Sequence, residues 1–408
     1  MRTAQFYFDL PPDRIAQYPP AERGKSRLMT LDRTAGRREH RVVEELPEIL
    51  SGPAFHRGGP PLLVFNNSKV RRAKITGAAK SGGASSPAEF LLLNRVDSLT
   101  WRAMAKRAKR RRGNLYRFGD NVEGEIVEIA GTAGEARTGI TGLRFNRPID
   151  DSWLDIHGRV PLPPYIKRGI PGGGFGAGGK DESADSGRYQ TVYADASAGA
   201  DLGPGASAAA PTAGLHFTEE LLARLEGAGI EGVFVTLHVG LGTFLPVRTE
   251  NVEDHVMHEE AYCIGGDAAR RINAARAGGR RIVAVGTTSL RTLEAAWRPG
   301  DHPENGGPPG AAEGFIPAGE GATSIFIYPG RRFRVADALF TNFHTPGSTL
   351  LMLAAAFAGA GTGVPAGEAR RPGGGAFPAG LALILESYAE AAREGYRFFS
   401  YGDAMLIY

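Results

Sequence analysis

The residues best suited to proton transfer are histidines, and four of the nine in the chain lie close together in sequence. They are His216, His238, His255 and His258. Histidine exchanges a proton near neutral pH, as general acid–base catalysis requires. Gly214 and Gly240 lie beside the first two, and glycine permits tight turns and close approach of the backbone to a ligand. The pattern predicts that His216 and His238 line an active site, with His258 in reserve; ordinary packing of these side chains is the alternative.

The spacing of His255 and His258 would also let both bind one metal ion from one face of a helix. No cysteine lies beside them, and the sequence offers no obvious third ligand. We therefore expect no metal site in this protein.

A polar turn after the apolar run 282–285 predicts a site for an anionic group. Four residues of this turn could contribute: Thr287, Thr288, Ser289 and Arg291. Free N–H groups at the start of a helix attract anions, and an arginine can hold a carboxylate or phosphate through two parallel hydrogen bonds. Simple capping of the helix by Thr288 or Ser289 is the alternative.

Two further polar pairs could line a site of the same kind. Asn342 and His344 follow the apolar run 338–341, so we expect their turn to converge with the first one. Tyr189 and Gln190 combine a phenol with an amide, which suits the reading of a nucleobase edge. Packing of Tyr189 in the core is the competing interpretation.

A strongly basic stretch spans residues 106–112, where every residue except Ala108 is lysine or arginine. Such a run at the tip of a β-hairpin could contact the phosphates of a nucleic acid and release their counterions. The residues that we expect to make these contacts are Lys106, Arg107, Lys109 and Arg110. A second basic group at 69–74 would enlarge this patch if it folded onto the same face. A solvated loop without a ligand is the alternative.

The hydrophobic pattern predicts two kinds of scaffold for these side chains. Short strands without long helices indicate a small antiparallel β-barrel-like domain at residues 62–149. The rest of the chain repeats strand, turn and helix, which indicates a mixed sheet flanked by helices. We therefore expect an α/β fold, with this small domain inserted into a large α/β catalytic domain formed by 1–61 and 150–408. The same pattern places strands at 323–328 and 397–401.

The composition fits a folded protein of a reducing compartment. The 408 residues are 42% hydrophobic and carry a net charge of only +4, so contact with nucleic acid must come from local patches. One cysteine, Cys263, excludes an intrachain disulfide. The N-terminus lacks the apolar core of a signal peptide, and the apolar run 349–360 is shorter than the ~20 residues of a membrane-spanning helix. We expect a cytoplasmic protein without membrane contact.

Ten stretches, in order along nearly the whole chain, resemble one enzyme family. They read LLVFNN at 62–67, VPLPPYI at 160–166, RYQTVY at 188–193, APTAGLHFT at 210–218, VTLHVGLGTF at 235–244, HVMHE at 255–259, VGTTS at 285–289, IFIYPG at 325–330, TNFH at 341–344 and YRFFSYGDAM at 396–405. In these stretches the sequence resembles the S-adenosylmethionine:tRNA ribosyltransferase-isomerase family of queuosine biosynthesis.

The resemblance implies a reaction and its partners. The enzyme would transfer and isomerise the ribosyl part of S-adenosylmethionine onto a tRNA that carries 7-aminomethyl-7-deazaguanine at the wobble position. The products would be epoxyqueuosine-tRNA, adenine and methionine. Since S-adenosylmethionine is consumed, the resemblance implies no bound cofactor and no metal, and we expect a monomer.

The matched stretches also contain the remaining residues that we expect to bind substrate. These are Thr212, Gly214, Gly240, Thr243, Tyr401 and Asp403. Without the resemblance, two other functions stay open: an RNA-binding protein without chemistry, and an S-adenosylmethionine-dependent RNA methyltransferase. A methyltransferase of this kind should have a glycine-rich loop after the first strand of a doubly wound unit. The sequence lacks such a loop, which counts against the methyltransferase.

Overall fold

The computed structural model describes most of the chain, and its residues fall into two compact units. The described residues are 1–80, 87–129, 140–168, 180–195, 197, 207, 209–240, 247–300, 314–360, 369–370 and 376–408. The first unit comprises Met1–Ser68, Thr191–Gly199 and Pro211–Tyr408, and the second comprises Lys69–Gln190 and Ala200–Ala210.

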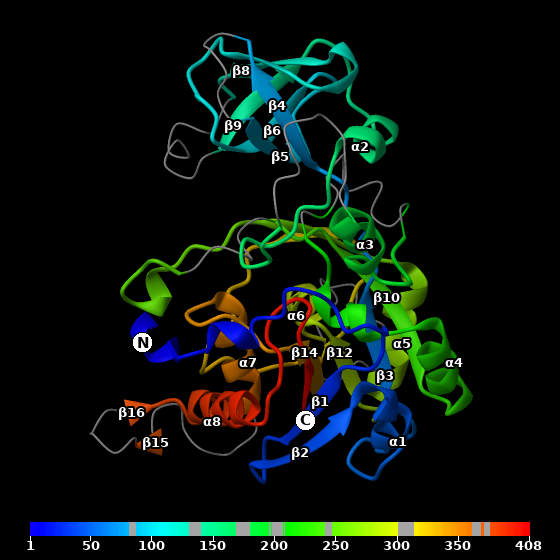
Figure 1. The fold of residues 1–408 in the computed structure, drawn as a ribbon. Helices are drawn as coiled ribbons and strands as arrows, with labels where there is room; N and C mark the ends of the chain where they lie inside the picture. Colours follow the sequence, from blue (N-terminus) through cyan, green and yellow to red (C-terminus); the bar gives the residue numbers. More distant parts are fainter. Residues whose placement is uncertain are drawn as a thin grey trace. The chain divides into compact units, whose positions relative to one another are not determined.

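A nine-stranded mixed sheet forms the centre of the first unit (Figure 1). In spatial order its strands are β13 (Gly319–Thr323), β11 (Glu260–Ile264), β10 (Glu231–Leu237), β3 (Leu62–Asn66), β12 (Ile282–Val285), β14 (Ala338–Asn342), β17 (Ala404–Ile407), β1 (Arg27–Asp32) and β2 (Arg37–Val42). The four strands β10, β3, β12 and β14 are mutually parallel. Their carboxyl ends therefore share one edge of the sheet, where α/β proteins place their ligands.

Helices cover both faces of this sheet. They are α1 (Leu46–Leu50), α4 (Glu219–Gly227), α5 (Gly266–Ala277), α6 (Thr287–Ala296), α7 (Thr349–Gly359) and α8 (Ala379–Arg393). One buried cluster joins α1 and α4 to alternate residues of the strands, such as Leu63 and Phe65 in β3. The intervening residues Leu62 and Val64 are equally buried, and α6 contacts β3, β10 and β12. Burial on both faces explains why the central strands are continuous apolar runs.

The connections between these elements include short 3-10 turns. They are η1 (Thr3–Phe6), η2 (Pro12–Arg14), η3 (Val43–Glu45), η7 (Thr212–His216) and η9 (Val252–Asp254). The helices α4 and α7 begin as their sequences predict, because Thr218 accepts the N–H of Leu221 and Ser348 accepts that of Leu351.

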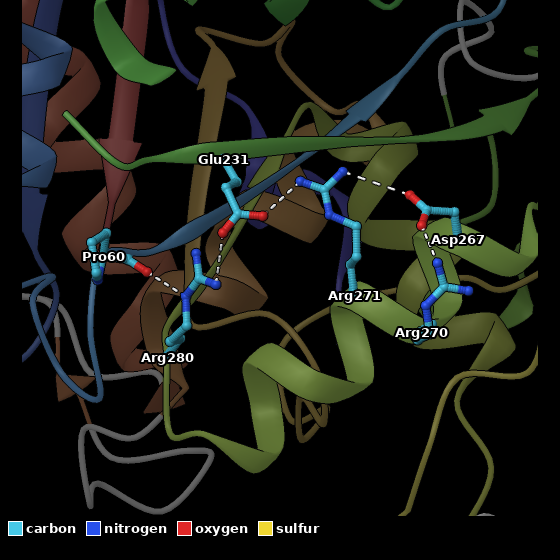
Figure 2. Close-up of polar contacts among 6 residues, drawn as sticks. All are labelled: Pro60, Glu231, Asp267, Arg270, Arg271 and Arg280. Atoms are coloured by element: carbon cyan, nitrogen blue, oxygen red, sulfur yellow. Dashed lines mark hydrogen bonds and ion pairs between the residues drawn. The ribbon is translucent and has the colours of Figure 1, made fainter. Parts of the chain in front are cut away.

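Charged side chains attach α5 to the amino end of β10 (Figure 2). The carboxylate of Glu231 accepts hydrogen bonds from Arg271 at 2.7 Å and from Arg280 at 3.1 Å. Arg280 also donates to the carbonyl of Pro60 at 2.7 Å, next to the start of β3. This network lies at the amino edge of the sheet, away from the carboxyl ends that carry the candidate site.

Replacing Glu231 with glutamine should lower the free energy of unfolding by less than about 1 kcal/mol, because exposed ion pairs contribute little. The Glu231 side chain is 44% exposed, so salt should screen its attraction to both arginines. Urea denaturation at low and at molar salt checks this, and the difference between variant and parent should shrink with salt. A salt-independent loss above about 2 kcal/mol would contradict this account.

A closed antiparallel barrel forms the core of the second unit. Its strands are β4 (Lys74–Ala79), β5 (Ala88–Arg95), β6 (Thr100–Lys106), β9 (Ile140–Phe145), β8 (Glu123–Val127) and β7 (Leu115–Arg117), in order around the barrel. Its interior holds Phe90, Trp101, Tyr116 and Phe145. The 3-10 turn η4 (Gly119–Asn121) and the helices α2 (Asp151–His157) and α3 (Lys180–Arg188) also belong to this unit. The expected fold class, a mixed α/β protein with a small antiparallel β-barrel, is confirmed.

Several expected elements lie elsewhere. The strand at residue 62 is β3, which pairs with β10 and β12 in the large sheet and not with the barrel. The strand expected at 323–328 ends at Thr323, because β13 covers Gly319–Thr323. The strand expected at 397–401 is a turn, in which Phe399 has a φ of 74° and the N–H of Gly402 donates to the carbonyl of Phe399. The strand follows the turn as β17, in the interior of the sheet.

Two short pieces complete the description. The strands β15 (Ala369–Arg370) and β16 (Ala376–Phe377) pair with each other outside the main sheet. None of the helices in the described part of the chain is long and apolar enough to cross a membrane.

Candidate active site

A chain of hydrogen bonds links three residues predicted for the site, at the carboxyl edge of the sheet. The hydroxyl of Thr212 donates to Oδ1 of Asn342 at 3.0 Å. The amide nitrogen Nδ2 of Asn342 lies 3.0 Å from Nε2 of His216. Asn342 ends β14, and the other two residues begin and end η7. The fold thus joins two motifs that are far apart in sequence.

This chain fixes which nitrogen of His216 carries the proton. An amide N–H can only donate, so Nε2 of His216 must be the acceptor and the neutral ring must hold its proton on Nδ1. Burial lowers the pKa of His216 to about 3, and the positive charges of Arg397 and Arg23 act in the same direction. His216 is therefore a neutral hydrogen-bond donor near neutral pH, and a weak base.

His344 is also buried and neutral. Its Nε2 lies 2.9 Å from the hydroxyl of Thr341, and its backbone N–H donates to the phenol of Tyr388 at 2.9 Å. Burial lowers the pKa of His344 to about 3. These two hydrogen bonds hold His344 in place beside the site.

Gly214 is required by a close contact within η7. A β-carbon at this position would lie 2.0 Å from the phenol oxygen of Tyr193 and 2.7 Å from a methyl carbon of Thr191. Tyr193 packs against Phe65 at the end of β3, with ring centroids 5.0 Å apart. The glycine beside His216 therefore serves the packing of η7 against Tyr193, and this contact fixes the position of His216.

The turn from β12 into α6 places hydroxyl groups at the same edge. Gly286 has a φ of 91° and a ψ of 153°, a conformation that only glycine adopts readily. The hydroxyl of Ser289 donates to the carbonyl of Val285 at 2.8 Å, so it is engaged within the helix. The hydroxyl of Thr288 is buried and has no hydrogen-bond partner in the described part of the chain. Thr287, the first residue of α6, is also buried.

Glu260, which the sequence analysis missed, joins Arg291 to Gly240. One carboxylate oxygen of Glu260 pairs with Nη1 of Arg291, and the other accepts the N–H of Gly240 at 2.9 Å. Both charged side chains are buried, at 4% exposure for Arg291 and 3% for Glu260. The sequence signal was its place directly after the matched stretch 255–259, but only the fold reveals this pairing.

The other histidines of the cluster differ in exposure. His238 directly follows β10, its backbone N–H donates to the carbonyl of Ala261 at 3.0 Å, and its side chain is half-buried. His258 is exposed. His255 contacts the ring of Phe326 at a centroid distance of 5.2 Å. Thr243 lies outside the described residues.

Tyr401 and Asp403 lie at the turn before β17. The two oxygens of Asp403 accept the backbone N–H groups of Arg27 at 3.1 Å and Arg397 at 2.7 Å. Burial raises the pKa of Asp403, although these hydrogen bonds oppose the shift. Tyr401 is buried as well. The contacts of Asp403 hold the turn to the start of β1.

Tyr189 and Gln190 belong to the second unit. Tyr189 is buried, as its core interpretation predicts. The side chain of Gln190 accepts the N–H of Val70 at 3.1 Å and donates to the carbonyl of Val70 at 3.2 Å. The amide of Gln190 thus holds the chain where it enters this unit.

The basic run is exposed but is not a hairpin tip. It connects β6 to β7, which pair with different neighbours in the barrel. The backbone of Lys109 donates to the phenol of Tyr116 at 2.7 Å, and its carbonyl accepts Nδ2 of Asn114 at 2.8 Å. The side chains of Lys106, Arg107, Lys109 and Arg110 are exposed. The backbone of the run is therefore held by hydrogen bonds, while its charged side chains are exposed to solvent.

The second basic group, at 69–74, is largely engaged within the unit. Arg71 pairs with Asp151 at 2.6 Å, and Lys74 pairs with Glu89 at 3.3 Å. Arg72 donates to the carbonyls of Asp155 and Gly158. Because these side chains already have partners within the unit, they are less available to extend the basic run at 106–112.

Among the residues that the structure describes, no three or more His, Cys, Asp or Glu side chains are grouped as a metal site would require.

Comparison with known proteins places the chain in a family. A crystal structure of S-adenosylmethionine tRNA ribosyltransferase from Thermotoga maritima is 29% identical, with a TM-score of 0.46, and the match covers 99% of this chain and 100% of that chain. Relatives from Treponema denticola and Desulfitobacterium hafniense, both named S-adenosylmethionine:tRNA ribosyltransferase-isomerase, are each 43% identical over 100% of both chains. The model of a family described as queuosine biosynthesis protein matches residues 3–366 and 375–407. The family model and these relatives confirm the resemblance seen in the motifs: the chain belongs to the queuosine biosynthesis protein family.

Proposed function

We propose that this protein transfers and isomerises the ribosyl group of S-adenosylmethionine onto 7-aminomethyl-7-deazaguanine at the wobble position of tRNA. The products are epoxyqueuosine-tRNA, adenine and methionine. Relatives that match over the full length carry the corresponding name. The observation that carries the proposal is the hydrogen-bonded chain Thr212–Asn342–His216, because it holds a neutral histidine donor at the sheet edge where α/β enzymes bind substrates.

The chemistry begins beside a sulfonium ion. The positive sulfur of S-adenosylmethionine acidifies the adjacent ribose C5′, so a base can remove a proton there. The resulting ylide opens the ribose ring and expels adenine, which takes up a proton. The opened chain carries a vinyl sulfonium at C4′–C5′ and an aldehyde at C1′. The aminomethyl nitrogen of the tRNA base adds to C4′, and the carbanion that this addition regenerates at C5′ closes a carbocycle on C1′. The alkoxide formed there displaces methionine from C5′ and closes the epoxide. This sequence needs a base, a proton donor and a site that excludes water.

The different surroundings of the two histidines favour different tasks for them. A general base works best when its pKa lies near the working pH, and the pKa of His216 is about 3. We therefore assign proton removal to His238 at the end of β10. His216 serves as a hydrogen-bond donor through Nδ1, oriented by Asn342. His258 is exposed and stays in reserve.

The hydroxyls and amides of the edge form the substrate-binding set. Thr287 and Thr288 supply the first turn of α6, and the buried hydroxyl of Thr288 is available to a ligand as far as the described residues show. Thr243, which lies outside the described residues, completes the proposed set. Ser289 is less suited to a ligand, because its hydroxyl already bonds to Val285.

A product assay tests the proposed function. The protein is incubated with S-adenosylmethionine and the precursor tRNA. Adenine and methionine should appear in equal amounts, and both should depend on the tRNA. Formation of S-adenosylhomocysteine would indicate methyl transfer instead. Binding of tRNA without any product would indicate an RNA-binding protein without chemistry.

The exposed basic run is the proposed tRNA contact. Changing Lys106, Arg107, Lys109 and Arg110 together to glutamine should weaken tRNA binding and lower the slope of log affinity against log salt by as much as about 3, since each phosphate contact contributes about 0.7–0.9. Titrations at several salt concentrations measure this slope. A matched control changes the exposed pair Arg331 and Arg332, which lie in the first unit. An equal change in both variants, or no change in the quadruple one, would contradict the assignment.

Three accompanying features are part of the proposal. The protein acts in the cytoplasm, where its tRNA substrate is found. It works as a monomer. S-adenosylmethionine is consumed in the reaction, so the proposed chemistry needs no resident cofactor.

A further inference from the structure

Arg291 is a buried cation with only part of its hydrogen-bonding capacity used. Its side chain is 4% exposed, and its Nη1 pairs with the carboxylate of Glu260. Its Nε and Nη2 are also buried, and neither has a hydrogen-bond partner among the described residues. A buried donor without an acceptor costs free energy. The two unused donors therefore indicate that an acceptor joins them at some stage of function.

The geometry of a guanidinium decides what kind of acceptor fits. The N–H groups of Nε and Nη2 lie parallel on one edge of the planar group. This edge matches the two oxygens of a carboxylate or phosphate, which it binds through paired hydrogen bonds. A single carbonyl oxygen does not match the two parallel donors of this edge as the two oxygens of an oxyanion do.

Glu260 holds Arg291 in a fixed orientation. Its two carboxylate oxygens are divided between Nη1 of Arg291 and the N–H of Gly240. Gly240 comes two residues after His238, so Glu260 connects α6 to the turn that follows the proposed base. A glutamine at position 260 could serve only one of these two donors through its single carbonyl oxygen.

We propose that the Nε–Nη2 edge of Arg291 binds an oxyanion of a substrate, and that Glu260 is the positioning residue that presents this edge. The inference rests on the proposed function, which supplies two sources of such a group. One is the carboxylate of the methionyl part of S-adenosylmethionine, and the other is a phosphate of the tRNA. The chemistry is the same for both, and binding experiments separate them.

The test measures the affinity of the parent and of the Arg291→Gln variant for three probes. The probes are S-adenosylmethionine, decarboxylated S-adenosylmethionine and the precursor tRNA at several salt concentrations. If Arg291 binds the carboxylate, the parent should prefer S-adenosylmethionine about 10- to 100-fold over the decarboxylated form, as a charge-assisted bidentate pair provides, and the variant should lose this preference. If Arg291 binds a phosphate, the variant should bind tRNA more weakly, and its salt slope should fall by about 0.7–0.9.

The inference is overturned if the variant keeps both the preference and the salt slope of the parent. Removing Arg291 alone leaves Glu260 buried without its partner, so the double variant Arg291→Gln, Glu260→Gln is measured beside it. This variant removes both charges and should show the same loss of discrimination. A parent protein that binds neither S-adenosylmethionine nor tRNA would overturn the proposed function as well.

Glu294 offers a matched control on the same helix. It is buried, and its carboxylate accepts the backbone N–H groups of Arg334, Val335 and Ala336. Glu294→Gln should lower the melting temperature and leave the affinities for all three probes within about twofold, as expected for sites without shared partners. The single variant Glu260→Gln should weaken binding of the oxyanion-bearing probe, and Glu260→Asp, which keeps two acceptor oxygens, should restore part of it. Equal effects of Glu260→Gln and Glu294→Gln on affinity would show that Glu260 is only structural.

Discussion

Replacing His238 with alanine should lower kcat for adenine release about 100- to 10,000-fold, which is the range that a positioned general base contributes. The affinity for S-adenosylmethionine should change far less, because the histidine acts on a proton and not on the bound ground state. His238 directly follows β10 and has both ring nitrogens buried, whereas His216 has its Nε2 occupied by Asn342 and its pKa lowered by burial to about 3. Proton removal therefore falls to His238 in this account.

Adenine release under saturating S-adenosylmethionine and tRNA measures the effect. His258→Ala is the matched control, because His258 belongs to the same stretch and is exposed. Its kcat should stay within about threefold of the parent, since surface substitutions away from such features change free energies by about 0.5 kcal/mol. If the His258 variant loses turnover and the His238 variant does not, the roles of the two histidines must be exchanged.

Acidification should destabilise the protein steeply between about pH 6.5 and pH 4, because two buried histidines must stay neutral in the folded state. Burial lowers the pKa of both His216 and His344 to about 3, from an ordinary value of 6.5. Below pH 6.5 both histidines are therefore protonated in the unfolded chain but stay neutral in the folded chain. Each proton costs about 1.4 kcal/mol per pH unit, so the two together remove about 2.7 kcal/mol per unit. The stability that the two neutral histidines contribute is fully present above pH 6.5 and is lost as the pH falls toward 3.

Two buried carboxyls act in the opposite direction at lower pH. Burial raises the pKa of Glu294 and of Asp403 from ordinary values of 4.5 and 3.8. These two carboxyls bind protons more readily in the folded chain than in the unfolded chain. At pH values near and above their ordinary pKa values, they therefore oppose the loss of stability that the histidines cause. The histidine effect should therefore be clearest between about pH 6 and pH 5, before the carboxyls take up protons.

Urea denaturation at pH 7, 6 and 5 measures this slope. His344→Gln should reduce the slope by about one proton, and it keeps a polar atom near Thr341. His56→Gln is the control, because His56 is exposed and should leave the slope unchanged. A flat stability between pH 7 and pH 5 in the parent would show that the buried histidines do not resist protonation.

The sequence predicts elements whose signals are local. Thr218 and Ser348 cap helices because a hydroxyl before an apolar periodic run has one favourable partner, the N–H three residues on. The buried strands β3, β12 and β14 are read directly from their apolar runs. The strand β2 is missed, because its residues Arg37–Val42 are mostly polar at the edge of the sheet.

What the sequence does not predict depends on pairing across long distances. The strands β6 and β7 are neighbours in sequence but not in the barrel, so the basic run was mistaken for a hairpin tip. The proton position on His216 depends on Asn342, which lies 126 residues away. The role of Glu260 depends on a guanidinium 31 residues further along the chain. Residue types and spacing show that such groups exist, but only the fold shows which of them meet.

The most direct test of the central claim follows the ribose carbon. S-adenosylmethionine labelled in the ribose, and separately in the methyl group, is incubated with the protein and the precursor tRNA. With ribosyl transfer, the ribose label should enter the tRNA as adenine is released, and the methyl label should leave in methionine. Methyl label in the tRNA, with the ribose label retained in S-adenosylhomocysteine, would contradict ribosyl transfer.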